Sequence, residues 1–286
     1  MRRRIDPLIA ERAPWLYRPG MATHAVRRAI MSGLGYRDTV KIASKLRHQA
    51  AQPIMAHMAS LLADQVTVSG LHHIPRHGPA LVVANHPTGV ADGIMLNHIL
   101  ATLRPDLFFY ANADILRVLP QLRAMIAPVE WRQGKRSVGK TRETMEYTRA
   151  AVAQGRLGVI FPSGRLAKRR GLALHERPWM ASAAMIARKF DLPVIPIHIQ
   201  ARNSALFYAL DLIHPSLRDI TLFYETLNKA RQPYKITVGE PISASALPKR
   251  SEDGIALLLR ATLALSEDGQ GRVSMWRATG VPSWIS

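Results

Sequence analysis

The sequence predicts an α/β fold in which a largely parallel, mixed sheet is flanked by helices. Short apolar runs typical of buried strands alternate with stretches whose apolar residues recur at helical spacing. Hydrophobic residues make up 48% of the 286-residue chain, enough for a full-sized core, and no linker or internal repeat divides it. We therefore expect a basic N-terminal helical segment over residues 1–65, an α/β domain over 66–266 and a mobile C-terminal tail over 267–286.

Residues 38–65 predict two helices, because apolar residues recur at helical spacing on both sides of Pro53. Proline cannot continue the hydrogen-bond ladder, so we expect the break at Pro53. Basic residues lie among the apolar ones, as in a helix at a membrane interface. Two placements remain open: the segment faces the membrane, or it packs on the α/β core with its charges in solvent. In the first case the inserted side chains are Ile54, Met58, Leu61 and Leu62.

From residue 66 onward, apolar residues occur in the alternating patterns and short runs typical of β-strands. Strands that alternate with helices imply a largely parallel sheet, whose catalytic groups lie in loops just past the carboxyl ends of strands. The predicted strands are 66–70, 80–84, 107–110, 126–129, 157–161, 194–199, 220–223 and 236–238. The predicted helices are 92–103, 138–154, 179–190 and 255–265.

The chain carries a formal net charge of +19, from 39 Lys and Arg against 20 Asp and Glu. The charge is clustered: residues 1–60 hold eleven basic and three acidic residues, and residues 131–170 hold eleven and two. An Arg-rich surface throughout and an anionic partner both explain such an excess, and the clustering favours the partner. An anionic membrane fits better than nucleic acid, since aromatic residues make up only 6% and no stacking motif is visible.

Features that the sequence lacks exclude several further classes of function and location. The chain has no cysteine, which excludes disulfides, thiolate catalysis and cysteine-ligated metals. No run approaches the roughly 20 apolar residues that span a bilayer, and the Arg-rich start lacks the apolar run of a signal peptide. We therefore expect a cytoplasmic protein that lies peripherally on the inner face of the cell membrane.

One loop concentrates residues suited to catalysis. The predicted strand 80–84 leads directly into Asn85-His86-Pro87-Thr88-Gly89-Val90-Ala91-Asp92, and a helix follows. His86 lies where the strand opens to solvent, and its ordinary pKa of about 6.5 suits a general base. The turn residues bring Asp92 back beside His86, where it would fix the tautomer and stabilise the imidazolium. Asp92 also suits an ordinary helix N-cap.

The stretch NHPTGVADG resembles the first motif of the glycerolipid acyltransferase superfamily, the lysophosphatidate and glycerol-phosphate acyltransferases. Five residues separate His86 from Asp92, one more than the superfamily's usual spacing, as in its bacterial hemolysin-like subgroup, which is similar to ornithine-lipid acyltransferases. The resemblance implies that His86 deprotonates the hydroxyl of a lyso-lipid, which attacks the thioester of acyl-CoA or acyl-carrier protein. It implies no further cofactor and no metal.

Three further stretches match the superfamily in order, so the resemblance covers roughly residues 60–245. Residues 127–132 resemble the second motif, whose arginine contacts acceptor phosphate. Residues 159–165 resemble the third motif, Phe-Pro-Glu-Gly-Thr-Arg, and residues 192–197 resemble the fourth, a strand beside the acyl pocket. The residues that we expect to bind substrate are Asn85, Gly89, Arg132, Ser163, Gly164, Arg165 and Lys168.

The third motif departs from the superfamily at two positions. Ser163 stands where the family has glutamate, and Arg165 where it has threonine. The family's glutamate helps to hold the acceptor, so its loss argues against glycerol 3-phosphate and lysophosphatidate. Arg165 and residues 168–170 would instead form a cationic rim for a different anionic headgroup or for the donor's phosphates.

Other kinds of site fit the sequence less well. His72, His73 and His77 invite a metal site, but no acidic or cysteine ligand lies near and their spacing matches no zinc pattern. The chain also lacks a phosphate-binding glycine-rich fingerprint. A catalytically retired fold that only binds anionic membranes is the alternative to an enzyme. The intact pair of His86 and Asp92 favours an O-acyltransferase.

Overall fold

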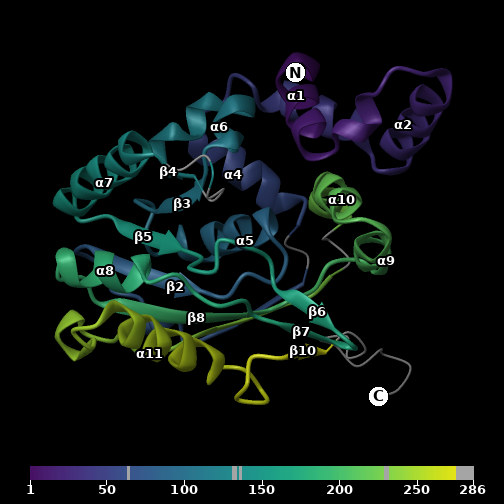
Figure 1. The fold of residues 1–286 in the computed structure, drawn as a ribbon. Coiled ribbons are helices and arrows are strands. Elements are labelled where there is room, and N and C mark those ends of the chain that lie inside the picture. Colours follow the sequence, from purple (N-terminus) through teal and green to yellow (C-terminus); the bar gives the residue numbers. More distant parts are fainter. Residues whose placement is uncertain (63–64, 131–133, 135–136, 229–231, 275–286) are drawn as a thin grey trace.

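A computed structural model describes residues 1–62, 65–130, 134, 137–228 and 232–274. Its centre is a seven-stranded sheet in the order β1-β9-β8-β2-β5-β3-β4 (Figure 1). Neighbouring strands are parallel except for β8 and β9, which confirms the predicted mixed sheet. The strands are β1 (Val66–Ser69), β2 (Ala80–Ala84), β3 (Phe108–Asn112), β4 (Ile126–Val129), β5 (Leu157–Ile160), β8 (Val194–Gln200) and β9 (Tyr234–Val238).

Helices alternate with the strands along most of the chain. Three of them begin elsewhere than predicted, α5 two residues earlier, α8 three residues later and α11 four residues earlier. The described helices are α1 (Arg2–Arg12), α2 (Met21–Gly33), α3 (Tyr36–Leu46), α4 (Ala51–Ser60), α5 (Val90–Leu100), α6 (Asp114–Val118), α7 (Val138–Ala153), α8 (Ser182–Lys189), α9 (Ala205–Ile213), α10 (Pro215–Asn228) and α11 (Ser251–Leu263).

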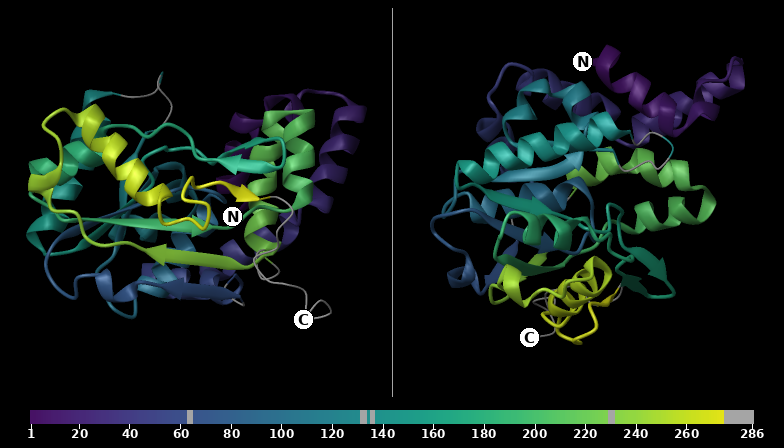
Figure 2. Two further views of the ribbon diagram at one scale, coloured as in Figure 1. Left: turned by 90° about the horizontal axis from the view of Figure 1, so that it is seen from below. Right: turned by 60° about the vertical axis from the view of Figure 1, so that its left-hand side comes forward.

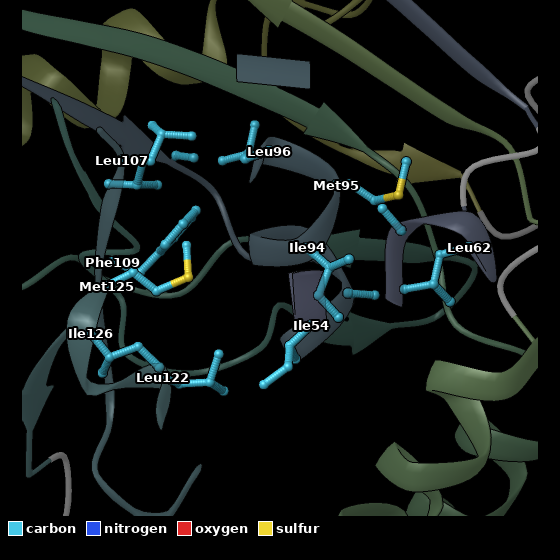
Figure 3. Close-up of a cluster of buried hydrophobic side chains, with 14 of the residues drawn as sticks. Ile54, Leu62, Ile94, Met95, Leu96, Leu107, Phe109, Leu122, Met125 and Ile126 are labelled. Carbon is cyan, nitrogen blue, oxygen red and sulfur yellow. The ribbon is translucent and has the colours of Figure 1, made fainter. Parts of the chain in front are cut away.

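The helices cover both faces of the sheet (Figures 1 and 2). Side chains of β2 divide between the faces, as the pleat of a strand requires. Val82 belongs to a core shared with α4 and α5, which Figure 3 shows, and Val83 to a core shared with α7, α8 and α11. β2 is therefore buried on both faces, in agreement with its continuous apolar sequence.

One predicted strand is wrong. Residues 220–223 lie in α10, where buried residues recur at helical spacing, at Leu217, Ile220 and Thr221 and again at Glu225. A four-residue apolar run fits the period of a strand and that of a helix, so the run alone does not distinguish them.

The predicted helix break at Pro53 is also wrong. α3 ends at Leu46 and α4 begins at Ala51, so Pro53 lies in the first turn of α4. The backbone N–H groups of a first turn have no partner within the helix, and proline is tolerated there.

The N-terminal segment packs largely on the core. Ile54 and Leu62 are each 1% exposed, so assigning them to membrane insertion was wrong. α2 differs, because none of its residues is buried and Met21 is 91% exposed. Within the described ranges, no helix has both the length and the apolar character that crossing a membrane requires.

A second, antiparallel sheet lies beside the first. It consists of β6 (Lys168–Arg170), β7 (Ala173–His175) and β10 (Val273–Ser274), in the order β10-β7-β6. Val273 is buried and pairs with Leu174, so this part of the predicted tail is an ordered strand. Residues 275–286 lie outside the described part of the chain.

Candidate active site

The loop that follows β2 begins at the middle of the main sheet, since β2 lies between β8 and β5. Asn85 is 2% exposed, and its side-chain amide donates to the Ile199 carbonyl at 2.9 Å. The Ile199 N–H donates to the Asn85 side-chain oxygen at 2.6 Å. These bonds join the end of β2 to β8 and anchor the loop. A contact between Asn85 and substrate stays a prediction.

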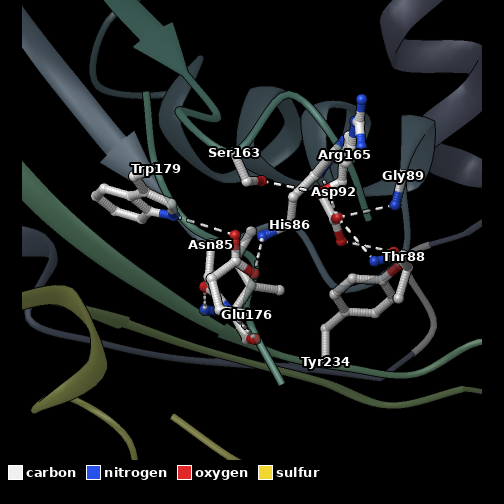
Figure 4. Close-up of polar contacts among 11 residues, drawn as sticks. Asn85, His86, Thr88, Gly89, Asp92, Ser163, Arg165, Glu176, Trp179 and Tyr234 are labelled. Atoms are coloured by element: carbon white, nitrogen blue, oxygen red, sulfur yellow. Dashed lines mark hydrogen bonds and ion pairs between the residues drawn. The ribbon is translucent and has the colours of Figure 1, made fainter. Parts of the chain in front are cut away.

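His86 and Asp92 lie side by side, as the sequence predicts (Figure 4). His86 Nδ1 is 2.9 Å from Asp92 Oδ2; the Asp92 side chain is fully buried, and that of His86 is 18% exposed. Nδ1 makes no aligned hydrogen bond within the described residues, although Oδ2 lies at hydrogen-bond distance. Because Nδ1 faces the carboxylate, Nε2 is the nitrogen left to act on a substrate.

Hydrogen bonds from its own loop hold the Asp92 carboxylate in place. Oδ2 accepts from the backbone N–H groups of Thr88 and Gly89, each at 2.9 Å, and Oδ1 accepts from the Thr88 hydroxyl. Since the Thr88 hydroxyl gives its proton to Asp92, the Tyr234 hydroxyl must donate to Thr88, at 2.7 Å. Burial and the nearby Asp92 charge raise the pKa of Tyr234, which keeps the phenol protonated as a donor.

Gly89 allows the loop to turn into α5. Its φ of 91° is one that side chains rarely adopt, and a Cβ there would lie 3.3 Å from Leu166 and 3.4 Å from Leu222. The N–H of Asp92 donates to the Gly89 carbonyl at 2.9 Å, so the two residues bond reciprocally at the helix start. The structure thus gives Gly89 a conformational role, and its contact with substrate stays a prediction.

The loop after β5 lies against the imidazole. The Phe161 ring stacks on that of His86, with centroids 4.3 Å apart and planes at 26°. Ser163 is buried, and its hydroxyl donates to the Arg165 carbonyl at 2.8 Å. The Ala167 N–H donates to the His86 carbonyl at 2.9 Å. The stretches that resemble the first and third motifs are therefore neighbours in space.

A carboxylate that the sequence analysis missed lies in the same place. Glu176 follows β7; it accepts from the His86 backbone N–H and from the Trp179 indole N–H, both at 3.1 Å (Figure 4). It also interacts with Ser163, which stands at the family's glutamate position. Burial raises the pKa of Glu176, although these hydrogen bonds oppose the rise. Only the β6–β7 hairpin returns Glu176 to His86, so no sequence spacing marks it.

The other predicted substrate residues lie around this centre. Gly164, with φ of 59°, makes the turn between Phe161 and the exposed Arg165. Lys168 is exposed at the start of β6. Arg132 lies outside the described residues. The structure therefore brings Gly164 and Arg165, with Ser163, to the His86 loop and leaves Lys168 on the adjoining hairpin.

This arrangement can remove a proton from a hydroxyl. An imidazole with a buried carboxylate at Nδ1 and a partly exposed ring has the arrangement that general-base catalysis requires, in which the carboxylate stabilises an imidazolium. No three His, Asp or Glu side chains of the described residues gather closely enough to hold a metal ion. Of the three histidines considered for a metal, His73 lies 3.0 Å from the Val238 carbonyl through Nδ1.

Comparison with known proteins gives a consistent result. Residues 65–200 match the acyltransferase family model. A lyso-glycine lipid O-acyltransferase of Phocaeicola vulgatus is 27% identical over 187 residues, which is 63% of this chain and 65% of that protein. A lyso-glycine lipid O-acyltransferase of Bacteroides thetaiotaomicron is 21% identical over 247 residues, 83% of this chain and 87% of that protein.

The 1-acyl-sn-glycerophosphate acyltransferase PlsC of Thermotoga maritima overlays with a TM-score of 0.49 at 15% identity, over 93% of this chain and 96% of that one. The region matched by the family model contains the whole His86 loop and Glu176. Residues 65–200 thus match an acyltransferase domain, and these relatives support an O-acyltransferase of the glycerolipid acyltransferase superfamily.

Proposed function

We propose that this protein transfers a fatty acyl group from a thioester donor to the hydroxyl of a lyso-lipid, with His86 as general base and Asp92 as its partner. The observation that carries the proposal is the imidazole itself, which has Nδ1 2.9 Å from a buried carboxylate and a ring that is partly open to solvent. The two relatives named as lyso-glycine lipid O-acyltransferases support the class of acceptor.

In the proposed reaction, His86 Nε2 takes the proton of the acceptor hydroxyl while the hydroxyl oxygen attacks the thioester carbonyl carbon. The tetrahedral intermediate expels the thiolate, which takes the proton from the imidazolium, so the products are an ester and a free thiol. Asp92 stays ionised throughout and stabilises the imidazolium. The donor is acyl-CoA or acyl-carrier protein, and no further cofactor takes part.

Acyl transfer to a panel of lyso-lipids, by the wild-type protein and by His86→Ala, tests this proposal. We expect His86→Ala to lose about 10²–10⁴-fold in rate, as is typical for a general base, with unchanged thermal unfolding. Near-normal transfer by His86→Ala with every acceptor would refute the mechanism. A wild-type protein that transfers nothing but binds vesicles would support the membrane-binding alternative.

The acceptor that we propose carries an amino-acid headgroup rather than glycerol phosphate. Ser163 replaces the family's glutamate, and the names of the two relatives point the same way. A competition assay between a lyso-amino-acid lipid and glycerol 3-phosphate checks this, and we expect the lyso-lipid to be acylated first. A clear preference for glycerol 3-phosphate would contradict it.

We also propose that the protein lies on the anionic inner leaflet of the cell membrane, by the face that carries α2, α9 and the β6–β7 hairpin. These elements lie at the same side of the molecule (right in Figure 1). Each presents exposed apolar side chains: Met21 on α2 is 91% exposed, Leu212 and Ile213 on α9 are each 71% exposed, and Leu172 in the hairpin is 60% exposed. Such side chains suit shallow insertion.

Basic residues of the same elements would supply the electrostatic part of this contact. Arg28 of α2 and Arg170 of β6 are exposed. A basic residue near an anionic leaflet contributes about 1 kcal/mol, and salt screens that contribution.

Sedimentation with vesicles of anionic or zwitterionic lipid tests this face. We expect binding to anionic vesicles that weakens with salt and that falls in a Leu212→Ser/Ile213→Ser double variant. Met185→Ser is the matched control, because Met185 is 55% exposed on α8, at the opposite side in Figure 1. Vesicle binding that does not change with salt concentration or with lipid charge would exclude an electrostatic contribution to membrane binding.

A further inference from the structure

A pocket of about 240 Å³ lies between the β6–β7 hairpin and helices α9 and α10. Its apolar wall belongs to a small hydrophobic cluster, which includes Leu166, Phe207 and Tyr208. Four basic side chains and one acidic side chain also line it. The charged residues are Lys168, Arg169, Arg177, Asp211 and Arg218.

The pocket adjoins the catalytic loop. Leu166 and Ala167 both line it, and the Ala167 N–H donates to the His86 carbonyl at 2.9 Å. Leu166 packs against Gly89 on the other side of the same loop. The pocket therefore adjoins the backbone of the loop that carries His86.

Positive charge in the pocket is only partly balanced. Arg218 pairs with Asp211 at 3.1 Å and with Asp219 at 2.8 Å. Arg177 donates through Nε to the Leu166 carbonyl at 2.9 Å, and no carboxylate of the described residues lies within 4.0 Å of its guanidinium nitrogens. Burial and the nearby charges of Arg165 and Arg218 lower the pKa of Arg177. An anion in the pocket would relieve this repulsion.

We propose that this pocket binds the anionic headgroup of the acceptor lipid and that Arg177 recognises it. The inference rests on the proposed transfer reaction and names the part of the substrate that the pocket selects. Arg177 lies two residues past the β6–β7 hairpin, outside the four stretches that resemble superfamily motifs. Nε of Arg177 donates to the Leu166 carbonyl, so its two Nη groups remain available. These two groups can bind a pair of carboxylate or phosphate oxygens side by side.

The acceptor fits this pocket better than the donor does. In a lyso-lipid the headgroup is only a few bonds from the hydroxyl that reacts, which suits a pocket that adjoins the His86 loop. The phosphates of acyl-CoA or acyl-carrier protein are separated from the thioester by the whole pantetheine arm. They would lie far from the pocket while the thioester reacts at His86.

Equilibrium binding to the His86→Ala variant tests the inference without turnover. The ligands for isothermal titration are a short-chain hydroxylated N-acylglycine, its methyl ester, a short-chain lysophosphatidate and a non-hydrolysable acyl-CoA analogue. Adding Arg177→Gln should weaken N-acylglycine binding by roughly 10- to 100-fold, as expected for loss of one charged hydrogen-bonded pair. Arg177→Lys, which keeps the charge but not the fork, should show a smaller loss. Arg142→Gln, on exposed α7 surface, is the matched control and should have no effect.

Comparing the four ligands shows whether the pocket binds a carboxylate, a phosphate or neither. An Arg177-dependent preference for N-acylglycine assigns the pocket to a carboxylate, and one for lysophosphatidate assigns it to a phosphate; either supports an anionic headgroup site. Equal binding of the acid and its ester, or an Arg177→Gln loss confined to the acyl-CoA analogue, would overturn the inference. Since this readout is binding, it is independent of the wild-type transfer assay that tests the proposed function. Thermal unfolding verifies that each variant folds.

Discussion

Replacing Asp92 should separate the two roles of its carboxylate, which holds the His86 loop and places a negative charge beside His86. Its oxygens accept from two backbone N–H groups and the Thr88 hydroxyl, and Oδ2 lies 2.9 Å from His86 Nδ1. In Asp92→Asn, the amide oxygen can replace Oδ2 as acceptor of both backbone bonds. The new NH₂ group then faces the Thr88 hydroxyl, which can accept. We therefore expect the fold to survive without the charge.

The expected magnitudes follow from these contacts. Without the carboxylate, the imidazolium loses a stabilising charge at contact distance, so Asp92→Asn should lower the transfer rate by about 10²–10⁴-fold. Asp92→Ala also leaves two buried N–H groups without an acceptor, at about 1–3 kcal/mol each. The unfolding free energy of Asp92→Ala should therefore fall by roughly 2–6 kcal/mol, a large part of the ~5–15 kcal/mol typical of a domain.

Single-turnover transfer and equilibrium urea unfolding, measured on both variants, check these values. Asp191→Asn is the matched control, since Asp191 is an exposed acid away from the site. Wild-type rates in a folded Asp92→Asn protein would refute Asp92 as the partner of His86. Equal stability of the Asn and Ala variants would refute the hydrogen-bonding account of the loop.

Three further predictions concern stability and can be checked by urea unfolding. Burial lowers the pKa of His198 from 6.5 to about 4. Its folded form therefore resists protonation, and the unfolding free energy should fall by about 3 kcal/mol as pH drops from 6.5 to 4. His198→Leu should flatten this slope, and an unchanged slope would contradict the assignment. Gly89→Ala should cost about 1–3 kcal/mol because of its φ of 91°, whereas Gly33→Ala, with open space around it, should not; equal costs would rule out strain at Gly89. Ile54→Ala should cost about 2–5 kcal/mol, and Met21→Ala at most about 0.5 kcal/mol; similar values would mean that α4 is not packed as described.

Local patterns were sufficient to predict most of the sheet and the pair at its centre. Strands such as β2 and β5 are buried on both faces, so each appears as a short continuous apolar run. His86 and Asp92 belong to one loop between a strand and a helix, and a tight turn brings residues at that spacing together wherever the rest of the chain lies.

Predictions failed where the outcome depended on distant segments. Residues 220–223 have an apolar run that suits a strand, but α10 packs as a helix against other helices instead. Ile54 and Leu62 have the pattern of an interfacial helix, and the same apolar stripe serves equally well to bury α4 on the core. An amphipathic pattern predicts that one side of a helix is buried, but it does not predict whether the protein core or a membrane covers that side.

Glu176 and Arg177 show the same limit of local sequence at the candidate active site. Nothing in the neighbouring sequence indicates that one accepts from the His86 backbone and the other lines a pocket beside it. Both are carried there by the β6–β7 hairpin, which packs on α9 and α10 through apolar contacts. Hydrophobic burial is non-directional. These apolar contacts therefore hold the hairpin in place, but the local sequence does not show which charged side chains they bring together. The pair proposed for catalysis is thus encoded in one short loop, whereas its surroundings arise from the packing of elements far apart in the chain.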